Sequence, residues 1–362
     1  MNLKIFAWWL AFPMAFNGHA QLKAFTENWA ADVSPNFGFF PHDSSHAYTN
    51  KPNADAGDGK ALQLMLAKDA KTAPGGGAGV QSNSSFLYGT FTARLKTADC
   101  SAQPNAGVVT GYFTYFNDGS DKNGDGLPDN SEIDFEWLCA EPQTIYLTLW
   151  TDFLDGTHQK RLSRVLNLAT GKIASTQSKT SWGSGPNLTG VENQPDTLTA
   201  LPGYNSSAAF YDYGISWSAD RVLWWMKNPK DGSRITLWDY RGPAARIPAR
   251  SSKYQFNVWH SSTWTPDALP SATQAPAGPI SAYVDWAAFD LAPVPLGLRV
   301  TPGISPSLIA TRPHDFFRFD ARGRRADPAH PCYLFGKPTN QVQGAQVQSQ
   351  IRRTQMAGAL AP

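Results

Sequence analysis

The sequence predicts an all-β fold, a sandwich or barrel built from short strands. Apolar and polar residues alternate over short runs separated by turn-rich segments, and no run with a helical period exceeds about three turns. The chain also contains 13 Trp, 12 Tyr and 20 Phe beside 30 Gly and 27 Pro, a composition typical of strands joined by turns. With 362 residues, we expect one large domain with appendages.

The N-terminal segment has the pattern of a secretory signal peptide. Lys4 supplies a positive charge, residues 5–16 form an apolar run, and residues 18–20 (Gly-His-Ala) form a small-x-small cleavage site. We therefore expect residues 1–20 to be removed and the mature protein to be secreted, either outside the cell or into the periplasm. No later segment is apolar over a length that spans a bilayer, so no membrane partner is expected.

Nine runs along the middle of the chain have strand character. They are Ala61 to Leu66, Leu87 to Lys96, Val108 to Phe116, Glu132 to Leu138, Thr144 to Trp150, Gly214 to Ser218, Arg221 to Lys227, Tyr254 to Trp259 and Ser281 to Phe289. Several carry a polar or aromatic face opposite an aliphatic one. Such a face is typical of a sugar-binding groove, because rings stack on sugar C–H surfaces while polar groups bind the hydroxyls.

One of these runs carries a row of acidic residues. Residues 132–138 read Glu-Ile-Asp-Phe-Glu-Trp-Leu, so on a strand Glu132, Asp134 and Glu136 share one face. Neighbouring carboxylates raise each other's pKa, and folding alone gives no reason to keep the row. Cleavage of a glycosidic bond needs one ionised and one protonated carboxyl group, so we predict that the row is catalytic. The alternatives are an exposed acidic face on an edge strand and a metal site.

The spacing of this row favours a retaining glycosidase if the strand lies on the concave face of a curved sheet. The α-carbons of Glu132 and Glu136 lie roughly 13 Å apart on a strand, whereas retaining enzymes hold their two carboxyls about 5 to 5.5 Å apart. The side chains must therefore converge, with Asp134 between them able to tune which one keeps its proton. We expect both glutamates to point into solvent.

The three cysteines permit one disulfide in an exported protein. If residues 108–116 fold back as a hairpin onto residues 132–138, Cys139 returns to the end of the hairpin that Cys100 enters. We therefore predict a Cys100–Cys139 disulfide and a free thiol at Cys332.

The loop before the acidic row is a candidate calcium site. Residues 121–132 satisfy the EF-hand template at every fixed position, but no helix flanks them and Pro128 interrupts the loop. A better candidate is a calcium loop that omits Glu132 and uses Asp121, Asn123, Asp125 and Asp129. The alternative is a polar hairpin loop of Gly, Asn and Asp.

Charge and composition limit the other partners. The formal net charge of +2 argues against a nucleic-acid partner. Residues 291–362 are rich in Pro, Gly, Gln, Ala and Arg with few apolar clusters, so we expect a disordered tail after a single domain at residues 21–290. We expect this domain to act as a monomer.

The chain resembles glycoside hydrolase family 16, which contains bacterial lichenases and plant xyloglucan endotransglycosylases. The resemblance runs from about Thr26 to Asp290 and rests first on the Glu-x-Asp-x-Glu pattern of residues 132–136. Shorter motifs follow the order of the family's strands, at residues 88–91, 107–115, 213–217, 257–259 and 283–286.

This resemblance implies a curved β-jelly-roll sandwich of two antiparallel sheets with an open substrate cleft on the concave face. It makes Glu132 the nucleophile, Glu136 the general acid/base and Asp134 the assisting carboxylate. The substrate-binding residues that it implies are Phe113, Tyr115, Tyr146, Thr148, Trp150, Asn257, Trp259 and Trp264, and His158 matches a further family position. Asp285 matches a position that binds a structural Ca²⁺ in some relatives, whereas the chemistry itself requires no cofactor.

The resulting expectation is a secreted, retaining endo-β-glucanase that acts on a β-linked polysaccharide and is similar to endo-β-1,3-1,4-glucanases. Lichenases carry an acidic residue and an Arg where this chain has Gly79-Val80-Gln81, so two of their sugar contacts are missing. One alternative is a transglycosylase acting on β-glucan or xyloglucan. Another is a jelly roll that binds carbohydrate without cleaving it, although binding alone does not require three carboxylates.

Overall fold

The computed structural model describes residues 23–42, 45–72, 77–117, 119–121, 130–151, 160–180 and 185–291. These residues form sixteen strands and two short 3-10 helices, η1 (Gly190–Glu192) and η2 (Ala244–Arg246). The predicted all-β fold is therefore confirmed. No helix in this part of the chain has the length and apolar character needed to cross a bilayer.

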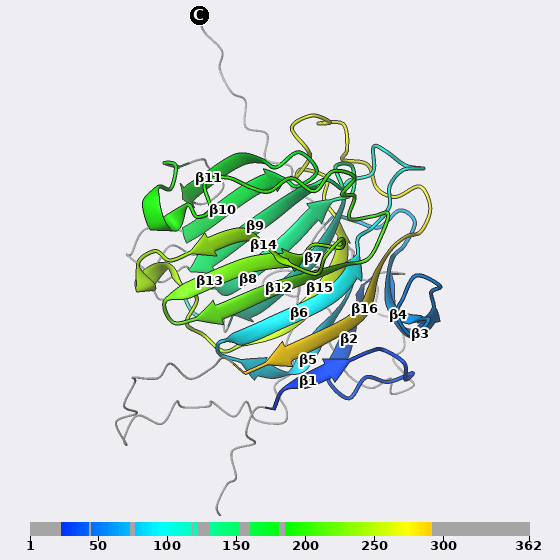
Figure 1. Cartoon of the computed structure of the whole chain (residues 1–362). Coiled ribbons are helices and arrows are strands. Elements are labelled where there is room, and N and C mark those ends of the chain that lie inside the picture. Colours follow the sequence, from blue (N-terminus) through cyan, green and yellow to red (C-terminus); the bar gives the residue numbers. More distant parts are fainter. Residues whose placement is uncertain are drawn as a thin grey trace, which may run out of the picture.

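The strands form two antiparallel sheets of eight strands each, which lie on one another as two layers (Figure 1). Sheet A has the order β14 (Arg234–Tyr240), β13 (Arg221–Lys227), β12 (Tyr211–Ser218), β6 (Gly89–Lys96), β16 (Ile280–Asp290), β4 (Lys60–Leu66) and β3 (His46–Pro52), with β1 (Phe25–Glu27) paired to β16. Sheet B has the order β11 (Lys172–Thr180), β10 (Lys160–Asn167), β9 (Thr144–Thr151), β8 (Asn130–Leu138), β7 (Val108–Asn117), β15 (Ser252–His260), β5 (Gly77–Phe86) and β2 (Phe37–His42). The predicted jelly-roll sandwich of two antiparallel sheets is confirmed.

The core lies between the sheets and follows from strand alternation. On β8 the residues Ile133, Phe135 and Trp137 face this core and are fully buried. Trp217 and Trp224 of sheet A are buried in the same cluster.

Aromatic rings back the acidic strand from the core side. Phe256 of β15, Tyr112 of β7 and Phe135 of β8 stack in nearly parallel planes with centroid distances of 5.3 Å and 5.4 Å, and Trp137 follows at 5.5 Å. Such pairs contribute about 0.5 to 1.5 kcal/mol each beyond their burial. The stack therefore fixes three adjacent strands of sheet B relative to one another.

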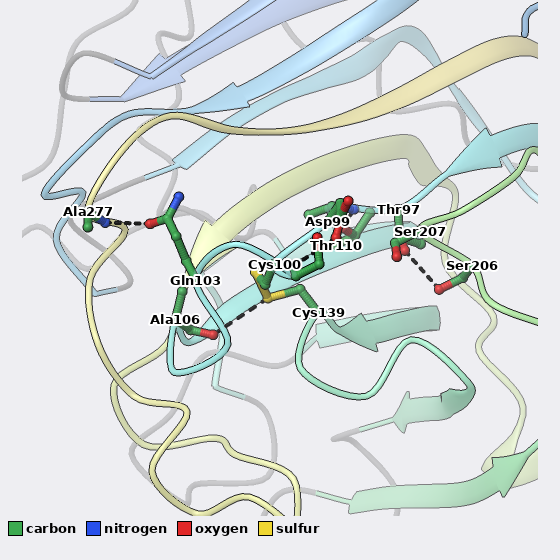
Figure 2. Close-up of a disulfide and its surroundings, with 12 residues drawn as sticks. Thr97, Asp99, Cys100, Gln103, Ala106, Thr110, Cys139, Ser206, Ser207 and Ala277 are labelled. Carbon is green, nitrogen blue, oxygen red and sulfur yellow. Dashed lines mark hydrogen bonds between the residues drawn. A yellow bond between two sulfur atoms is a disulfide. The ribbon is translucent and has the colours of Figure 1, made fainter.

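A disulfide joins the two sheets, as Figure 2 shows. Cys100 follows β6 of sheet A, Cys139 follows β8 of sheet B, and the two are bonded with their α-carbons 5.5 Å apart. Beside it, Cys139 N–H donates to the Val108 carbonyl at the start of β7. The predicted pairing is confirmed, whereas Cys332 lies outside the described residues.

Strand β5 was not among the predicted strands. Its sequence, residues 77–86, is rich in Gly, Ser and Asn, which favour turns over strands. It forms a strand because β15 and β2 pair with it on both sides. The predicted signal peptide and most of the predicted tail and calcium loop lie outside the described residues, so these remain predictions.

Candidate active site

Strand β8 places the three carboxylates on the face of sheet B that points away from the core. Ladder pairing sets their neighbours on β7 and β9: Tyr115 and Trp150 flank Glu132, Phe113 and Thr148 flank Asp134, and Gly111 and Tyr146 flank Glu136. None of these six neighbours is basic. The predicted row therefore exists, on a central strand rather than an edge strand, among uncharged aromatic and small residues.

The three carboxylates differ in burial and support. Glu132 is 7% exposed and accepts a hydrogen bond of 2.9 Å from the Asn130 side-chain amide, while Asp134 is 2% exposed. The expectation that both glutamates point into solvent is wrong for Glu132, since the bulky Tyr115 and Trp150 flank it. Glu136 is only half-buried, with Gly111 on one side.

The core face holds the backbone of this strand in place. The Trp224 indole N–H of sheet A donates to the Asp134 main-chain carbonyl at 3.0 Å. The Trp137 indole N–H donates to Tyr204 at 3.1 Å. These bonds and the aromatic stack fix the position from which the carboxylate side chains project.

All of the predicted substrate-binding residues gather on or beside this face. They are Phe113 and Tyr115 on β7, Tyr146, Thr148 and Trp150 on β9, Asn257 and Trp259 on β15, and Trp264 in the loop that follows β15. The Trp264 ring packs against Tyr146 at 5.1 Å and against Trp259 at 6.2 Å between centroids. Tyr146 and Trp264 are half-buried, as Glu136 is.

A further acidic residue lies at the end of this face. The Tyr146 hydroxyl donates a hydrogen bond to the Glu141 carboxylate. Burial raises the pKa of Glu141 above its ordinary value, and the nearby Asp267 acts in the same direction against that hydrogen bond. Sequence reasoning missed Glu141, because it lies in a turn outside the alternating pattern.

One other feature of the face was missed. Gly111 makes room for its neighbour, because a Cβ there would lie closer than 3.0 Å to the side-chain oxygen of Asn257. Gln255 lies on β15 in the row of Asp134, and alternation with Phe256 and Val258 already placed it on this face. Gln255 therefore belongs to the polar face that the sequence predicted, although it was not among the predicted substrate-binding residues.

The predicted metal ligands form no assembled site in the part of the chain that the structure describes. Asp285 accepts hydrogen bonds from Gly57 N–H at 3.0 Å and from the Arg94 guanidinium at 2.9 Å. No group of three or more His, Cys, Asp or Glu side chains there could hold a metal ion. Asp121 is described, but Asn123, Asp125, Asp129 and His158 lie outside the described residues. Calcium binding stays a prediction.

Comparison with known proteins gives a family match for the region that contains β8. The family model described as glycosyl hydrolases family 16 matches residues 42–172. A curated relative, "Probable glycosidase CRR1" from Saccharomyces cerevisiae (strain ATCC 204508 / S288c), is 25% identical over 199 residues, which cover 54% of this chain and 34% of that protein. The match thus spans about a third of the length of this relative.

Solved structures with a similar chain arrangement include a Bacillus licheniformis beta-glucanase and an apo Crh5 transglycosylase. The first is 15% identical and has a TM-score of 0.42, with 74% of this chain and 97% of that chain covered. The second is 15% identical and has a TM-score of 0.43, with 75% and 85% covered. A family 16 endo-glucanase from Bacteroides ovatus, in complex with G4G3G-2F-DNP, is 12% identical with a TM-score of 0.45, covering 73% and 99%.

Proposed function

Because the chain carries a domain of glycosyl hydrolases family 16, we propose that it is a retaining enzyme that cleaves internal β-linkages of a β-glucan by double displacement. The observation that carries this proposal is the row of Glu132, Asp134 and Glu136 on one face of a central strand with no basic residue directly across from it. The signal-peptide pattern of residues 1–20 and the disulfide support action outside the cytoplasm.

The residue roles follow from the surroundings of each carboxyl group. The amide of Asn130 donates to Glu132 and so orients the carboxylate that acts as the nucleophile. Glu136 is half-buried, so the departing oxygen and an incoming water can reach it. Asp134 lies between them on the same face and takes the role of the assisting carboxylate.

In the first step the Glu132 carboxylate attacks the anomeric carbon, and the bond from this carbon to the glycosidic oxygen breaks. Glu136 donates its proton to that oxygen, which leaves as the hydroxyl of the released chain. In the second step Glu136 takes a proton from water, and the water oxygen displaces Glu132 from the anomeric carbon. Two displacements at one carbon retain its configuration.

A second candidate function is transglycosylation, in which a sugar hydroxyl replaces water in the second step. The half-buried rings of Tyr146 and Trp264 favour it, because Tyr146 is the ladder neighbour of Glu136, the residue that would activate the acceptor, and Trp264 packs against Tyr146. Digestion of a panel of β-glucans and galactans with product sizing, with and without a labelled acceptor oligosaccharide, separates the two. Labelled products longer than the acceptor indicate transfer.

Rescue by azide tests the catalytic roles. In Glu132→Ala, azide attacks the anomeric carbon directly and should give a glycosyl azide of inverted configuration. In Glu136→Ala, azide attacks the glycosyl–Glu132 intermediate and should give the retained configuration. The opposite pattern would exchange the two roles. A chain that binds these polysaccharides without cleaving any of them would instead be a binding protein.

A further inference from the structure

We propose that a pocket between the last strands of the two sheets is a second binding site for a sugar unit of the polysaccharide, separate from the acidic row. This inference rests on the proposed function. Strand β2 ends sheet B, β3 ends sheet A, and the two strands contact each other on one side of the sandwich (Figure 1). The pocket there has a volume of about 380 Å³ and is lined by Phe39 of β2, Asp32 from the connection between β1 and β2, and residues 47–52 of β3. Sites for small molecules have volumes of about 300 to 1,000 Å³.

This pocket is not part of the face that carries the acidic row. A Cβ on Gly79 would meet the Phe40 ring at 2.2 Å, and Gly79 is the ladder partner of Asn257, so Phe40 lies on the acidic face. Phe39 therefore lies on the other side of β2 and, like Ala47 of β3, packs against the core between the sheets. Along sheet B, four strand spacings, about 19 Å, separate β2 from β8. A sugar unit in the pocket is thus not the unit that is cleaved.

A β-bulge in β3 shapes the pocket. Tyr48 and Lys51 pair with positions 63 and 61 of β4, so two residues of β3 oppose one residue of β4. The extra residue brings Tyr48 and Lys51 to the same side of β3, where the Lys51 ammonium lies 4.5 Å from the centroid of the Tyr48 ring. Asn50 within the bulge has a φ of 55°, a left-handed conformation that Asn adopts more readily than most residues. Bulges are frequent at sheet edges and beside functional sites, where they redirect side chains.

The segment before β2 holds this bulge in place. The Asn50 N–H donates to the Trp29 carbonyl at 2.7 Å, and the Asn50 side-chain amide donates to the Asp32 carboxylate at 3.0 Å. The Thr49 hydroxyl donates to the Asp32 main-chain carbonyl at 2.8 Å. These bonds order the lining groups before a ligand arrives, which lowers the entropy cost of binding.

The chemistry of the lining selects an uncharged ligand with both donors and acceptors. Asp32 is exposed and can accept further hydrogen bonds beside the one from Asn50, whereas the half-buried Lys51 carries three donors. This carboxylate and this ammonium balance each other, so the pocket offers no net charge to an ion. Phe39 and Tyr48 are half-buried and offer ring surface for sugar C–H groups, while the polar groups match sugar hydroxyls.

The test is the double substitution Tyr48→Phe/Lys51→Met, which removes a hydroxyl and an ammonium but keeps the ring and most of the alkyl stem. Lys96→Met/Tyr283→Phe is the matched control, because the Lys96 ammonium also lies over a tyrosine ring of sheet A, 5.6 Å from the Tyr283 centroid, and neither residue lines the pocket. In a Glu132→Gln background, sedimentation with amorphous cellulose, insoluble β-1,3-glucan and insoluble mixed-linkage glucan measures binding. In the native background, kcat/KM on soluble tetrasaccharides measures the action of the acidic row.

We expect Tyr48→Phe/Lys51→Met to weaken binding to the preferred polysaccharide about tenfold, as the loss of hydrogen bonds to a ligand does. Its kcat/KM on tetrasaccharides and its Tm should stay unchanged, and the control should change neither binding nor kcat/KM. Binding within about twofold of the parent, or an equal loss in the control, would overturn the inference. A parallel fall in kcat/KM on tetrasaccharides would also overturn it, because the effect would then lie at the acidic row.

Failure of the proposed function gives a different result. If the native chain cleaves none of these glucans, the proposed function fails, and the sedimentation measurement still decides on the pocket. A loss of binding confined to Tyr48→Phe/Lys51→Met would support the pocket as a sugar site, whereas a parent that binds none of the three polysaccharides would overturn it.

Discussion

Acidic residues on the outer faces of the two sheets have different surroundings. On sheet A, Arg94 bonds to Asp212 at 3.2 Å and to Asp285 at 2.9 Å, and Arg221 bonds to Asp239 at 2.6 Å. On sheet B, the three carboxylates of β8 alternate along one strand, and their ladder neighbours are aromatic or small and carry no charge. On sheet A these acids are held by arginines, whereas on sheet B three acids follow one another along a single strand.

This difference indicates where function outweighs stability. Ion pairs at a surface contribute only about 0 to 1 kcal/mol each, but they leave no repulsion between acids. Carboxylates that share one face of a strand repel one another, and such repulsion shifts the proton affinities of close neighbours apart. The separation of an acid from a nucleophile requires such a shift. We therefore expect substitutions of acids on the two faces to have unlike effects.

The largest contrast should appear in turnover. Glu132→Gln and Glu136→Gln should each lower kcat by a factor of about 100 to 10,000, because each removes a group that acts in the transition state. Asp212→Asn on sheet A is the matched control and should change kcat less than about twofold. Initial rates on soluble β-glucan, together with circular dichroism to confirm folding, check this prediction. Full activity in either glutamine variant would remove the basis of the proposed function.

The acidic face was predictable from the sequence because a strand has a period of two. Alternation alone placed Glu132, Asp134 and Glu136 together, and hairpin reasoning gave the partner of Cys100. Period-two patterns are local, so strands with clear alternation, such as β8 and β9, were found.

The remainder of the site depends on contacts that are distant in sequence. Strand β5 reads as a loop until β15 and β2 pair with it, so the position of Gln81 opposite Gln255 could not be derived. The burial of Glu132 depends on the bulk of Tyr115, a neighbour that ladder register supplies. Glu141 lies in a turn, where no period indicates which way a side chain points.

Removal of the disulfide tests whether the two sheets unfold as one unit. The double variant Cys100→Ser/Cys139→Ser should lose about 3 to 4 kcal/mol of unfolding free energy in the chain-entropy model, since the bond closes a loop with a sequence separation of 39. Urea denaturation measures this loss. Cys332→Ser should leave the midpoint unchanged. A loss below about 1 kcal/mol, or a transition that splits in two, would show that packing alone couples the sheets.

Two glycines, one on each sheet, allow the faces to be compared, because an added Cβ would meet a similarly close neighbour at both positions. A Cβ on Gly111 would lie closer than 3.0 Å to Asn257, and a Cβ on Gly214 of sheet A would lie equally close to the Trp225 ring. Each Ala variant should lose about 1 to 3 kcal/mol of stability through overpacking. Only Gly111→Ala should also lower kcat/KM, because it displaces the Asn257 amide, which lies over the ladder neighbour of Glu136. Equal kinetic effects in the two variants would contradict the separation of the faces.

On sheet A, a paired acid should stabilise the fold only above a low pH. Burial alone would raise the pKa of Asp239, but the hydrogen bonds and charges of Arg221 and Arg241 hold this pKa below its ordinary value. Its stabilisation is therefore present above the unfolded-state pKa of about 3.9 and is lost as pH falls through the lower folded-state pKa. Asp239→Asn should lower Tm at pH 7 by an amount that vanishes towards pH 2.5. A pH-independent loss would assign the effect to packing.

Glu141, at the edge of the acidic face, should give a pH dependence of stability opposite in sign to that of Asp239. The effect should be smaller, because Glu141 is partly exposed to solvent. Burial raises the pKa of Glu141, so its contribution is fully present below the ordinary pKa of about 4.3 and is lost as pH rises through the raised value. Glu141→Gln keeps an oxygen that can accept the Tyr146 hydroxyl hydrogen bond but cannot ionise. The Tm of this variant minus that of the native protein should therefore increase between pH 4 and pH 7, whereas for Asp239→Asn the corresponding difference should become more negative as pH rises from 2.5 to about 4. If both differences move in one direction, acids on the two faces respond to pH alike and the contrast between the sheets does not extend to their protonation.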